Sequence, residues 1–235
     1  MQEENEVSDS DVLGLARECL QKYRDEMGWV SRAEVKIDIM EFYEAVIYPE
    51  YEIRLLTDYD LGCCDGQKIL GKTIPNEGII LVDKSINQQS KDPRFTFTLG
   101  HEIGHAILHA KPNTIYRCTE DSICYGGQNL REYQANLFAA NLIMPAKFVR
   151  DRYIHHYGDG PFLYSGPGYY DIAQGVYVDS FGRFGWQLAR PLTGYFSNIS
   201  KQSLAYRMCR LGLIINQTAE SLFGAKKLSC NGVIS

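Results

Sequence analysis

The sequence predicts an α+β fold, in which a small and mainly antiparallel sheet packs on a helix that carries two histidines. Three features of the chain lead to this prediction. Residues 51–82 contain three short strand-like runs, separated by turn residues at hairpin-scale spacing. Apolar residues recur at helical spacing on both sides of this stretch. The motif His101-Glu102-Ile103-Gly104-His105 falls on one of those helical segments, so the sheet and the motif helix are expected to share a core.

Two helices are expected before the strands. Helical spacing of apolar residues predicts an amphipathic helix over Asp11–Glu26. Its candidate caps are Ser8, Asp9 and Ser10. Asp38, with Glu41 three residues later, resembles a capping box and predicts a second helix, which Pro49 should end. The strand-like runs follow at Tyr51–Leu56, Lys68–Ile74 and Gly78–Val82.

The motif helix has a recognisable start and stop. Asp92 is expected as its N-cap, and Pro93 occupies the first helical position, where the missing N–H costs nothing. The helix should end near Lys111-Pro112. An apolar stripe lies beside the histidine face and is formed by Phe95, Leu99, Ile103, Ala106, Ile107 and Ala110.

The two motif histidines can share one metal ion. At about 100° per residue, a step of four residues returns to nearly the same face of a helix, so His101 and His105 point the same way. Glu102 is not aimed at that ion, but its carboxylate can reach a water bound there and act as general base. The alternative is that two histidines are neighbours by chance, on the surface or in the core.

A catalytic zinc ion usually takes three protein ligands and a water molecule, so a third ligand is needed. Lys111 stands where an extended motif would place a third histidine, which excludes that route. His109 lies roughly 80° around the helix from His101. We therefore expect His109 to pack beside the site, supporting a ligand, rather than to bind the metal.

The better candidate for the third ligand lies on a second helical segment, Leu130–Met144, which Pro145 stops. One face of this segment carries Glu132, Ala135, Asn136 and Ala139. The small alanines would let the two helices pack closely, presenting Glu132 to the metal and Asn136 one turn further on. The alternative for Glu132 is an exposed carboxylate in the first turn, which the helix dipole favours.

These residues resemble the ImmA/IrrE family of metallo-endopeptidases. The resemblance rests on Phe95–Gly100 leading into the motif, on Ile107–His109, on Glu132–Ala140 and on Met144-Pro145. It implies a zincin-like fold and a gluzincin-like site with one zinc ion per chain, held by His101, His105 and Glu132, with Glu102 as catalytic base. It also implies a protein substrate, often a helix-turn-helix transcriptional repressor whose cleavage switches on stress or mobile-element genes.

Further along the chain, Leu204–Ile214 resembles the short helix-turn-helix-like segment of this family, with Ser200 near its turn. We expect one compact peptidase domain over residues 1–235. Its parts would be a zincin-like core at 1–152, a Gly/Tyr-rich insertion at 153–186, the helix-turn-helix-like segment at 187–216 and a tail at 217–235.

The insertion is expected to be an ordered aromatic loop, which either lines the cleft or is a plain surface loop. A tetrahedral oxyanion is usually stabilised by a Tyr, His or Arg from another segment. The candidates in and beside the insertion are Tyr153, His155, His156, Tyr164 and Tyr169. A substrate peptide could add to an exposed edge of the sheet, for which the strand near Ile79–Val82 is our hypothesis.

The composition of the chain bears on whether it binds nucleic acid and on where in the cell it acts. A net charge of −5 and a pI near 5.6 argue against direct nucleic-acid binding. The acidic start of the chain does not resemble a signal peptide, and no apolar run approaches the length of a membrane span. Seven cysteines at irregular spacing fit reduced thiols in the cytoplasm.

Three functions compete at this stage. The first is a cytoplasmic zinc endopeptidase acting on a regulatory protein. The second is a metal-binding fold whose role is to bind a partner, against which the intact Glu102 argues because a pure binding site needs no base. The third is a zinc hydrolase of a small amide, which a narrow closed pocket would favour over an open groove.

Overall fold

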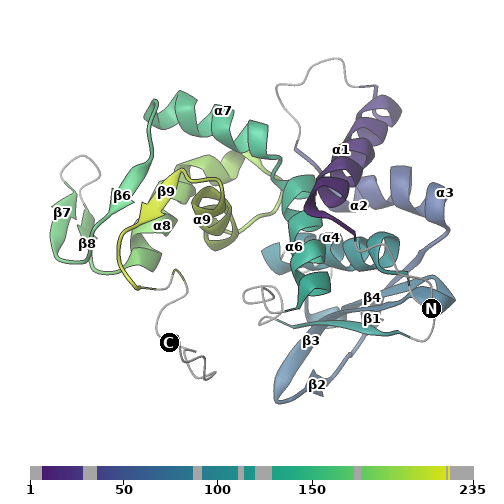
Figure 1. Cartoon of the computed structure of the whole chain (residues 1–235). Coiled ribbons are helices and arrows are strands. Elements are labelled where there is room, and N and C mark those ends of the chain that lie inside the picture. The colour runs from purple at the N-terminus through teal and green to yellow at the C-terminus, as the bar shows by residue number, and fades with distance from the viewer. Residues whose placement is uncertain are drawn as a thin grey trace. The chain divides into compact units, whose positions relative to one another are not determined.

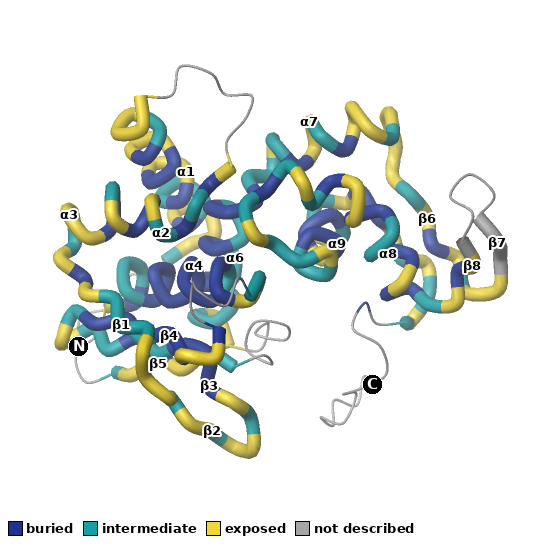
Figure 2. Tube along the Cα trace, turned by 180° about the vertical axis from the view of Figure 1, so that it is seen from behind, coloured by how far each residue is buried: buried dark blue, intermediate teal, exposed yellow. Residues whose placement is uncertain are grey.

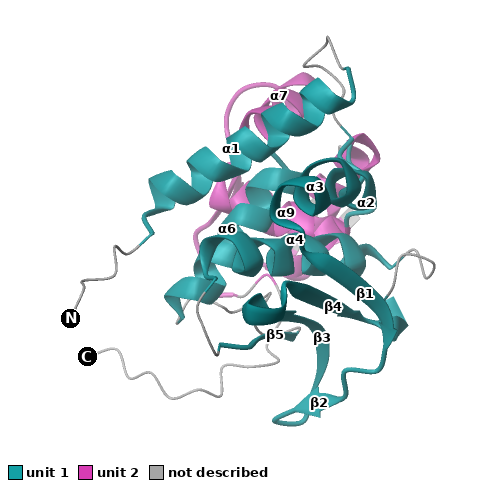
Figure 3. Cartoon of the chain, turned by 90° about the vertical axis from the view of Figure 1, so that its right-hand side faces the viewer, with its two compact units in different colours: residues 1–145, 196–199 teal, residues 146–195, 200–235 magenta. Residues whose placement is uncertain are grey.

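The computed structural model describes residues 7–28, 36–86, 92–110, 114–119, 129–171, 176–220 and 222. The chain divides into two compact units, residues 1–145 with 196–199 and residues 146–195 with 200–235 (Figure 3). Both units combine helices with short strands, so the predicted α+β class is confirmed. The expected single domain and its internal boundaries stay predictions.

The first unit contains the expected helices (Figure 1). They are α1 (Asp9–Glu26), α2 (Ile39–Phe42), α3 (Tyr48–Tyr51), α4 (Pro93–Leu108) and α6 (Leu130–Ile143). At the start of α1, the Ser8 side chain accepts from the Asp11 N–H while the Asp11 carboxylate accepts from the Ser8 N–H. This reciprocal pair is a capping box, which explains why the helix begins two residues earlier than its apolar pattern.

The helix that Asp38 opens does not end at Pro49. The Asp38 carboxylate caps α2 by accepting from the N–H groups of Met40 and Glu41, as expected. A π-helical turn, η1 (Tyr43–Ile47), then leads into α3. Pro49 lies in the first turn of α3, where a missing N–H donor is tolerated, so the prediction that it stops the helix was wrong.

In the part of the chain that the structure describes, the sheet has five strands and is mainly antiparallel, as predicted, with one parallel pair. Its strands are β1 (Arg54–Tyr59), β2 (Cys63–Cys64), β3 (Gln67–Ile74), β4 (Ile79–Asp83) and β5 (Tyr116–Thr119). β3 pairs antiparallel with β2, β4 and β5, whereas β1 pairs parallel with β4. β4 therefore lies between β1 and β3, and our hypothesis that the strand near Ile79–Val82 is an exposed edge was wrong.

α4 is the central element of this unit. One side of it lies against β3, β4 and β5, and another side packs on α6 (Figures 1 and 2). Leu99 and Ile103 of α4 are completely buried, as are Ile80 and Val82 of β4. α4 ends at Leu108, three residues before the expected stop, and His109 is its C-cap. The histidine motif therefore lies in the core of the unit.

Two glycines of α4 face α6. A Cβ atom at Gly104 would lie 3.1 Å from the Cα and 3.3 Å from the carbonyl oxygen of Ala135. A Cβ at Gly100 would lie 3.4 Å from the Cβ of Ala139, which is ordinary contact. The small residues on both helices thus allow the close packing that the sequence predicted for the alanine face.

Short helices and strands make up the second unit, including the stretch 153–186 where the sequence predicted a loop. They are α7 (Ala146–Tyr157), β6 (Phe162–Tyr164), β7 (Tyr169–Asp171), β8 (Val176–Val178), α8 (Phe181–Ala189), η6 (Arg190–Tyr195), α9 (Lys201–Arg210) and β9 (Ile214–Asn216). β6 pairs parallel with β9, and β7 pairs antiparallel with β8. The loop prediction for 153–186 was wrong, because Tyr153, Tyr164 and Phe184 are buried core residues of this unit.

The glycines misled that prediction. Gly158, Gly160, Gly166 and Gly168 all have positive φ, so they make the turns that separate very short strands. Ser200 caps α9, with its side chain accepting from the Ser203 N–H, which agrees with its expected place near a turn. Among the described residues, no helix combines the length and the apolar character needed to cross a membrane.

The contact between α4 and α6 can be tested with two matched glycines. Gly104→Ala should destabilise the protein by about 1–3 kcal/mol, because the added methyl group meets backbone atoms of Ala135 that cannot move aside cheaply. Gly100→Ala is the control and should be neutral, or stabilising by up to about 1 kcal/mol through helix propensity. Chemical denaturation of both variants measures the difference. Equal stability of the two variants would contradict the packing argument.

Candidate metal centre

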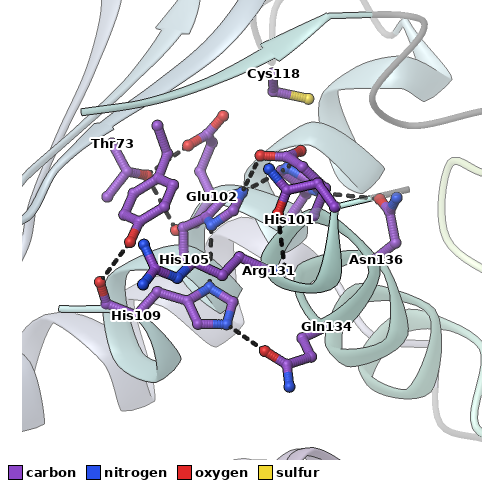
Figure 4. Close-up of polar contacts among 12 residues, drawn as sticks. Thr73, His101, Glu102, His105, His109, Cys118, Arg131, Gln134 and Asn136 are labelled. Atoms are coloured by element: carbon purple, nitrogen blue, oxygen red, sulfur yellow. Dashed lines mark hydrogen bonds and ion pairs between the residues drawn. The ribbon is translucent and has the colours of Figure 1, made fainter. Parts of the chain in front are cut away.

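Three metal-binding side chains converge where α4 meets α6 (Figure 4). The Nε2 atoms of His101 and His105 are 3.0 Å apart. Glu132 Oε2 lies 3.3 Å from Nε2 of His101, and Glu132 Oε1 lies 3.1 Å from Nε2 of His105. Both histidines are completely buried, and the Glu132 side chain is 14% exposed. The structure thus brings together the three side chains that the sequence predicted as metal ligands.

These distances fit a small cation. Four ligands around a tetrahedral zinc ion, with bonds of about 2.0–2.2 Å, lie roughly 3.3 Å from one another. The three observed separations match that value closely enough for one ion to contact all three atoms after small side-chain adjustments. Two imidazoles and one carboxylate leave the fourth position for water, as in catalytic zinc sites.

The electrostatics of the three groups favour a positive ion. Burial opposes charge on Glu132, yet the pKa of its carboxyl lies well below the usual range because His101 and His105 face it. Burial lowers the pKa of His105 to about 4 despite the contact with Glu132, so this imidazole is neutral at neutral pH. For His101, burial acts in the same direction, but the Glu132 contact and the Glu102 charge outweigh it and raise the pKa. A cation would replace the proton that His101 otherwise attracts.

Asn136 orients the first histidine, as its predicted position one turn beyond Glu132 suggested. Its Oδ1 atom lies 2.9 Å from Nδ1 of His101. Since an amide oxygen only accepts hydrogen bonds, Nδ1 of His101 must carry the proton and donate it. The lone pair of the ring is therefore on Nε2, which faces Glu132 and the proposed ion.

His109 contacts the second histidine and lies outside the group of three side chains that could hold a metal ion. Its Nδ1 lies 3.1 Å from Nδ1 of His105, and its Nε2 lies 2.9 Å from Oε1 of Gln134. Gln134 in turn donates from Nε2 to the carbonyl oxygen of Val7. Tyr116 stacks on the His105 ring at 4.2 Å between centroids and donates its hydroxyl proton to the His109 carbonyl oxygen. The His105 ring is therefore held at its edge and on its face.

Strand β3 positions Glu102, which is completely buried. The Thr73 hydroxyl lies 2.5 Å from Oε2 of Glu102 and 3.1 Å from its backbone carbonyl oxygen. Oε1 accepts no hydrogen bond from the described residues. A Cβ at Gly71 would lie 2.5 Å from that same oxygen, so only glycine leaves room for the carboxylate. Burial raises the pKa of Glu102 to about 7, although His101 and Thr73 act against this shift.

Four residues of the site were not predicted from the sequence, namely Gly71, Thr73, Tyr116 and Gln134. Gly71 and Thr73 are two residues apart on β3 and therefore point to the same face of the sheet, toward α4. Gln134 lies on the second helix, two residues after Glu132. A polar residue at that spacing was visible in the sequence, but its partner His109 comes from a different helix.

The residues proposed for the oxyanion all lie in the second unit. Two of them already donate hydrogen bonds within that unit. The hydroxyl of Tyr153 donates to the Gly160 carbonyl oxygen, and that of Tyr164 donates to Glu220. Each hydroxyl has one proton to donate, so neither tyrosine has one left for a substrate. His155 and His156 are exposed on α7, and their role stays a prediction. The side chain of Tyr169 lies outside the described residues.

A buried carboxylate base beside an open cation position is the arrangement of a metal-dependent hydrolase. Comparison with known protein families narrows this class. Residues 85–159 match the model of the IrrE N-terminal-like domain, Peptidase_M78, so this part of the chain is similar to a metallopeptidase domain. The resemblance inferred from the sequence is thereby confirmed. No curated protein matches the chain.

The space that Gly71 leaves for Glu102 can be tested directly. Gly71→Ala should displace the Glu102 carboxylate and reduce hydrolysis by about 10²-fold or more, the usual size of a general-base effect. The metal content should stay the same, because the three atoms nearest to the new methyl group belong to Glu102 and Thr98 and not to the proposed ligands. Gly14→Ala is a suitable control, since a Cβ there meets no atom within 4 Å. Full activity of Gly71→Ala would show that the position of the Glu102 carboxylate does not depend on the space left by Gly71.

Proposed function

We propose that this chain is a zinc-dependent endopeptidase. One observation carries the proposal. Three ligand atoms 3.0–3.3 Å apart lie next to a buried glutamate whose Oε1 atom accepts no hydrogen bond from the described residues. A site that only bound a metal would have no use for such a base. The family match supports peptide-bond hydrolysis as the reaction.

Zinc is the ion that this donor set suits best. Two neutral imidazoles and one carboxylate are typical of catalytic zinc sites, whereas magnesium and calcium prefer oxygen ligands alone. When bound, zinc would polarise the peptide carbonyl and make the attacking water more acidic. The protein would bind one such ion per chain through His101, His105 and Glu132.

Glu102 would move the proton during the reaction. Its Oε2 is occupied by the Thr73 hydroxyl, so Oε1 is the atom that accepts the proton from the attacking water. The water oxygen bonds to the carbonyl carbon, the C–N bond breaks, and Glu102 returns the proton to the leaving amine. Burial raises the pKa of Glu102 to about 7, which makes its carboxylate a stronger base than that of an exposed glutamate.

Strand β5 is the better place for a substrate segment, now that β4 is known to be internal. One edge of β5 pairs with β3, and the other edge has no strand partner in the part of the chain that the structure describes. Tyr116 of this strand stacks on His105, so β5 runs beside the metal centre. We propose that an extended substrate segment pairs with this free edge, which places its backbone near Glu102.

The substrate that we propose is a regulatory protein, for example a helix-turn-helix transcriptional repressor. This part of the proposal rests on the resemblance to the ImmA/IrrE family and on the family match. A substrate of that kind acts in the cytoplasm, which agrees with the cysteine content of the chain. An extended edge strand suits a polypeptide better than a small amide.

The zinc site predicts different results for two substitutions. Glu102→Gln should keep one zinc ion per chain and lose hydrolysis by about 10²-fold or more, since the amide keeps the shape of the side chain but cannot accept the proton. His105→Ala should lose the metal itself. Elemental analysis after dialysis, together with peptide cleavage, measures both quantities. Wild-type turnover by Glu102→Gln would remove Glu102 from the mechanism.

The substrate class can be tested with the zinc-loaded protein and repressors encoded near its gene. Incubation should give two fragments of one repressor, whose masses locate a single cleaved bond, and Glu102→Gln should give none. Stable binding of a partner without fragments would favour the partner-binding alternative. Turnover of small acyl amides, with no protein cleaved, would favour the small-amide hydrolase.

A further inference from the structure

A second set of metal-binding groups overlaps the proposed zinc site. It consists of His101, Glu102 and Cys118, which are all buried and offer ligand atoms that lie within 4.8 Å of one another (Figure 4). Cys118 lies on β5 and its thiol is not in a disulfide. The two sets share only His101, since the first is completed by His105 and Glu132.

A buried cysteine on a strand is by itself just a small core residue. What distinguishes Cys118 is the carboxylate next to it. Oε1 of Glu102 is buried and accepts no hydrogen bond from the described residues, although a buried carboxylate oxygen normally has a partner. A carboxylate oxygen of Glu102, the Cys118 sulfur and a His101 ring nitrogen form a cluster of three different donors around one small region.

The chemistry of this second set differs from that of the first. Thiolate is a soft ligand that selects ions such as zinc or cadmium over magnesium or calcium. The first set contains no sulfur, so it has no such preference for the softest ions. Binding at the second set would form a sulfur–metal bond while the thiol proton goes to solvent, with no change of oxidation state.

We propose that His101, Glu102 and Cys118 form a second position for a thiophilic divalent cation, and that an ion bound there inhibits hydrolysis. The inhibition rests on the function proposed above, because the ion would bind the Glu102 carboxylate that accepts the proton from water. The two positions also compete for His101. An ion at the second position therefore both blocks the base and weakens the first ligand set.

The test uses cadmium(II) as probe on the zinc-loaded protein. Excess cadmium should inhibit peptide cleavage, and the ultraviolet charge-transfer absorption of a cadmium thiolate should rise in parallel. Cys118→Ala should lose that part of the absorption, and the cadmium concentration for half-inhibition should rise by about tenfold or more. Cys63→Ala is the matched control, because Cys63 is an exposed thiol outside the cluster, and it should behave like the wild type in inhibition.

Two further measurements keep the outcomes distinct. Cys118→Ser preserves the size of the side chain, so it separates loss of the sulfur from loss of packing, and thermal unfolding checks both variants. If no peptidase activity is found, the absorption and the cadmium stoichiometry still test the second position without the proposed function. Equal absorption and equal inhibition in the wild type and Cys118→Ala would overturn the proposal, as would equal inhibition by magnesium.

Discussion

The close approach of α4 and α6 is the constraint on which the site depends. Metal–ligand bond lengths vary by only about 0.2 Å, so the two helices must approach closely enough for all three side chains to reach one ion. Gly104 against Ala135 sets this separation, since even one methyl group there would press on backbone. Glu132 lies in the first turn of α6, about one turn before Ala135, and His101 and His105 lie on either side of Gly104 in α4. The smallest residues of both helices therefore lie beside the three side chains that must meet.

The sheet contributes the other half of the geometry. Gly71 and Thr73 face α4 from adjacent positions on the same side of β3, one leaving space for the Glu102 carboxylate and the other bonding one of its oxygens. The helices thus determine where a cation can bind, and the strand determines which oxygen of Glu102 is available to a water molecule. This division explains why the motif helix must be buried on two sides. An exposed helix with the same motif would have neither the base geometry nor the raised pKa of Glu102.

Local spacing was sufficient to predict His101, Glu102 and His105, because a spacing of four residues on one helix fixes the relative directions of the two histidines. Glu132 also lay within reach, since its helix face is small and polar. Gly71, Thr73 and Cys118 could not be predicted, because their contacts depend on the register of β3 and β5 against α4. The edge strand was misplaced for the same reason. The residue pattern of each strand is a local feature of the sequence. The parallel pairing of β1 with β4 joins strands that are distant in the sequence, so no local pattern predicts it.

The hydrogen bonds behind the site have one direction, and a cation would fix it. With Nε2 of His105 facing the ion, Nδ1 carries the proton and donates to His109, whose Nε2 then donates to Gln134, which donates to the Val7 carbonyl oxygen. A carboxylate behind His105 would add negative charge, whereas this neutral chain adds none. Of the three proposed ligands only Glu132 is anionic, so a divalent ion would keep a net positive charge with which to polarise a carbonyl group. This row of hydrogen bonds ends at Val7, the residue before the Ser8 N-cap of α1. The start of α1 therefore helps determine the orientation of a proposed metal ligand.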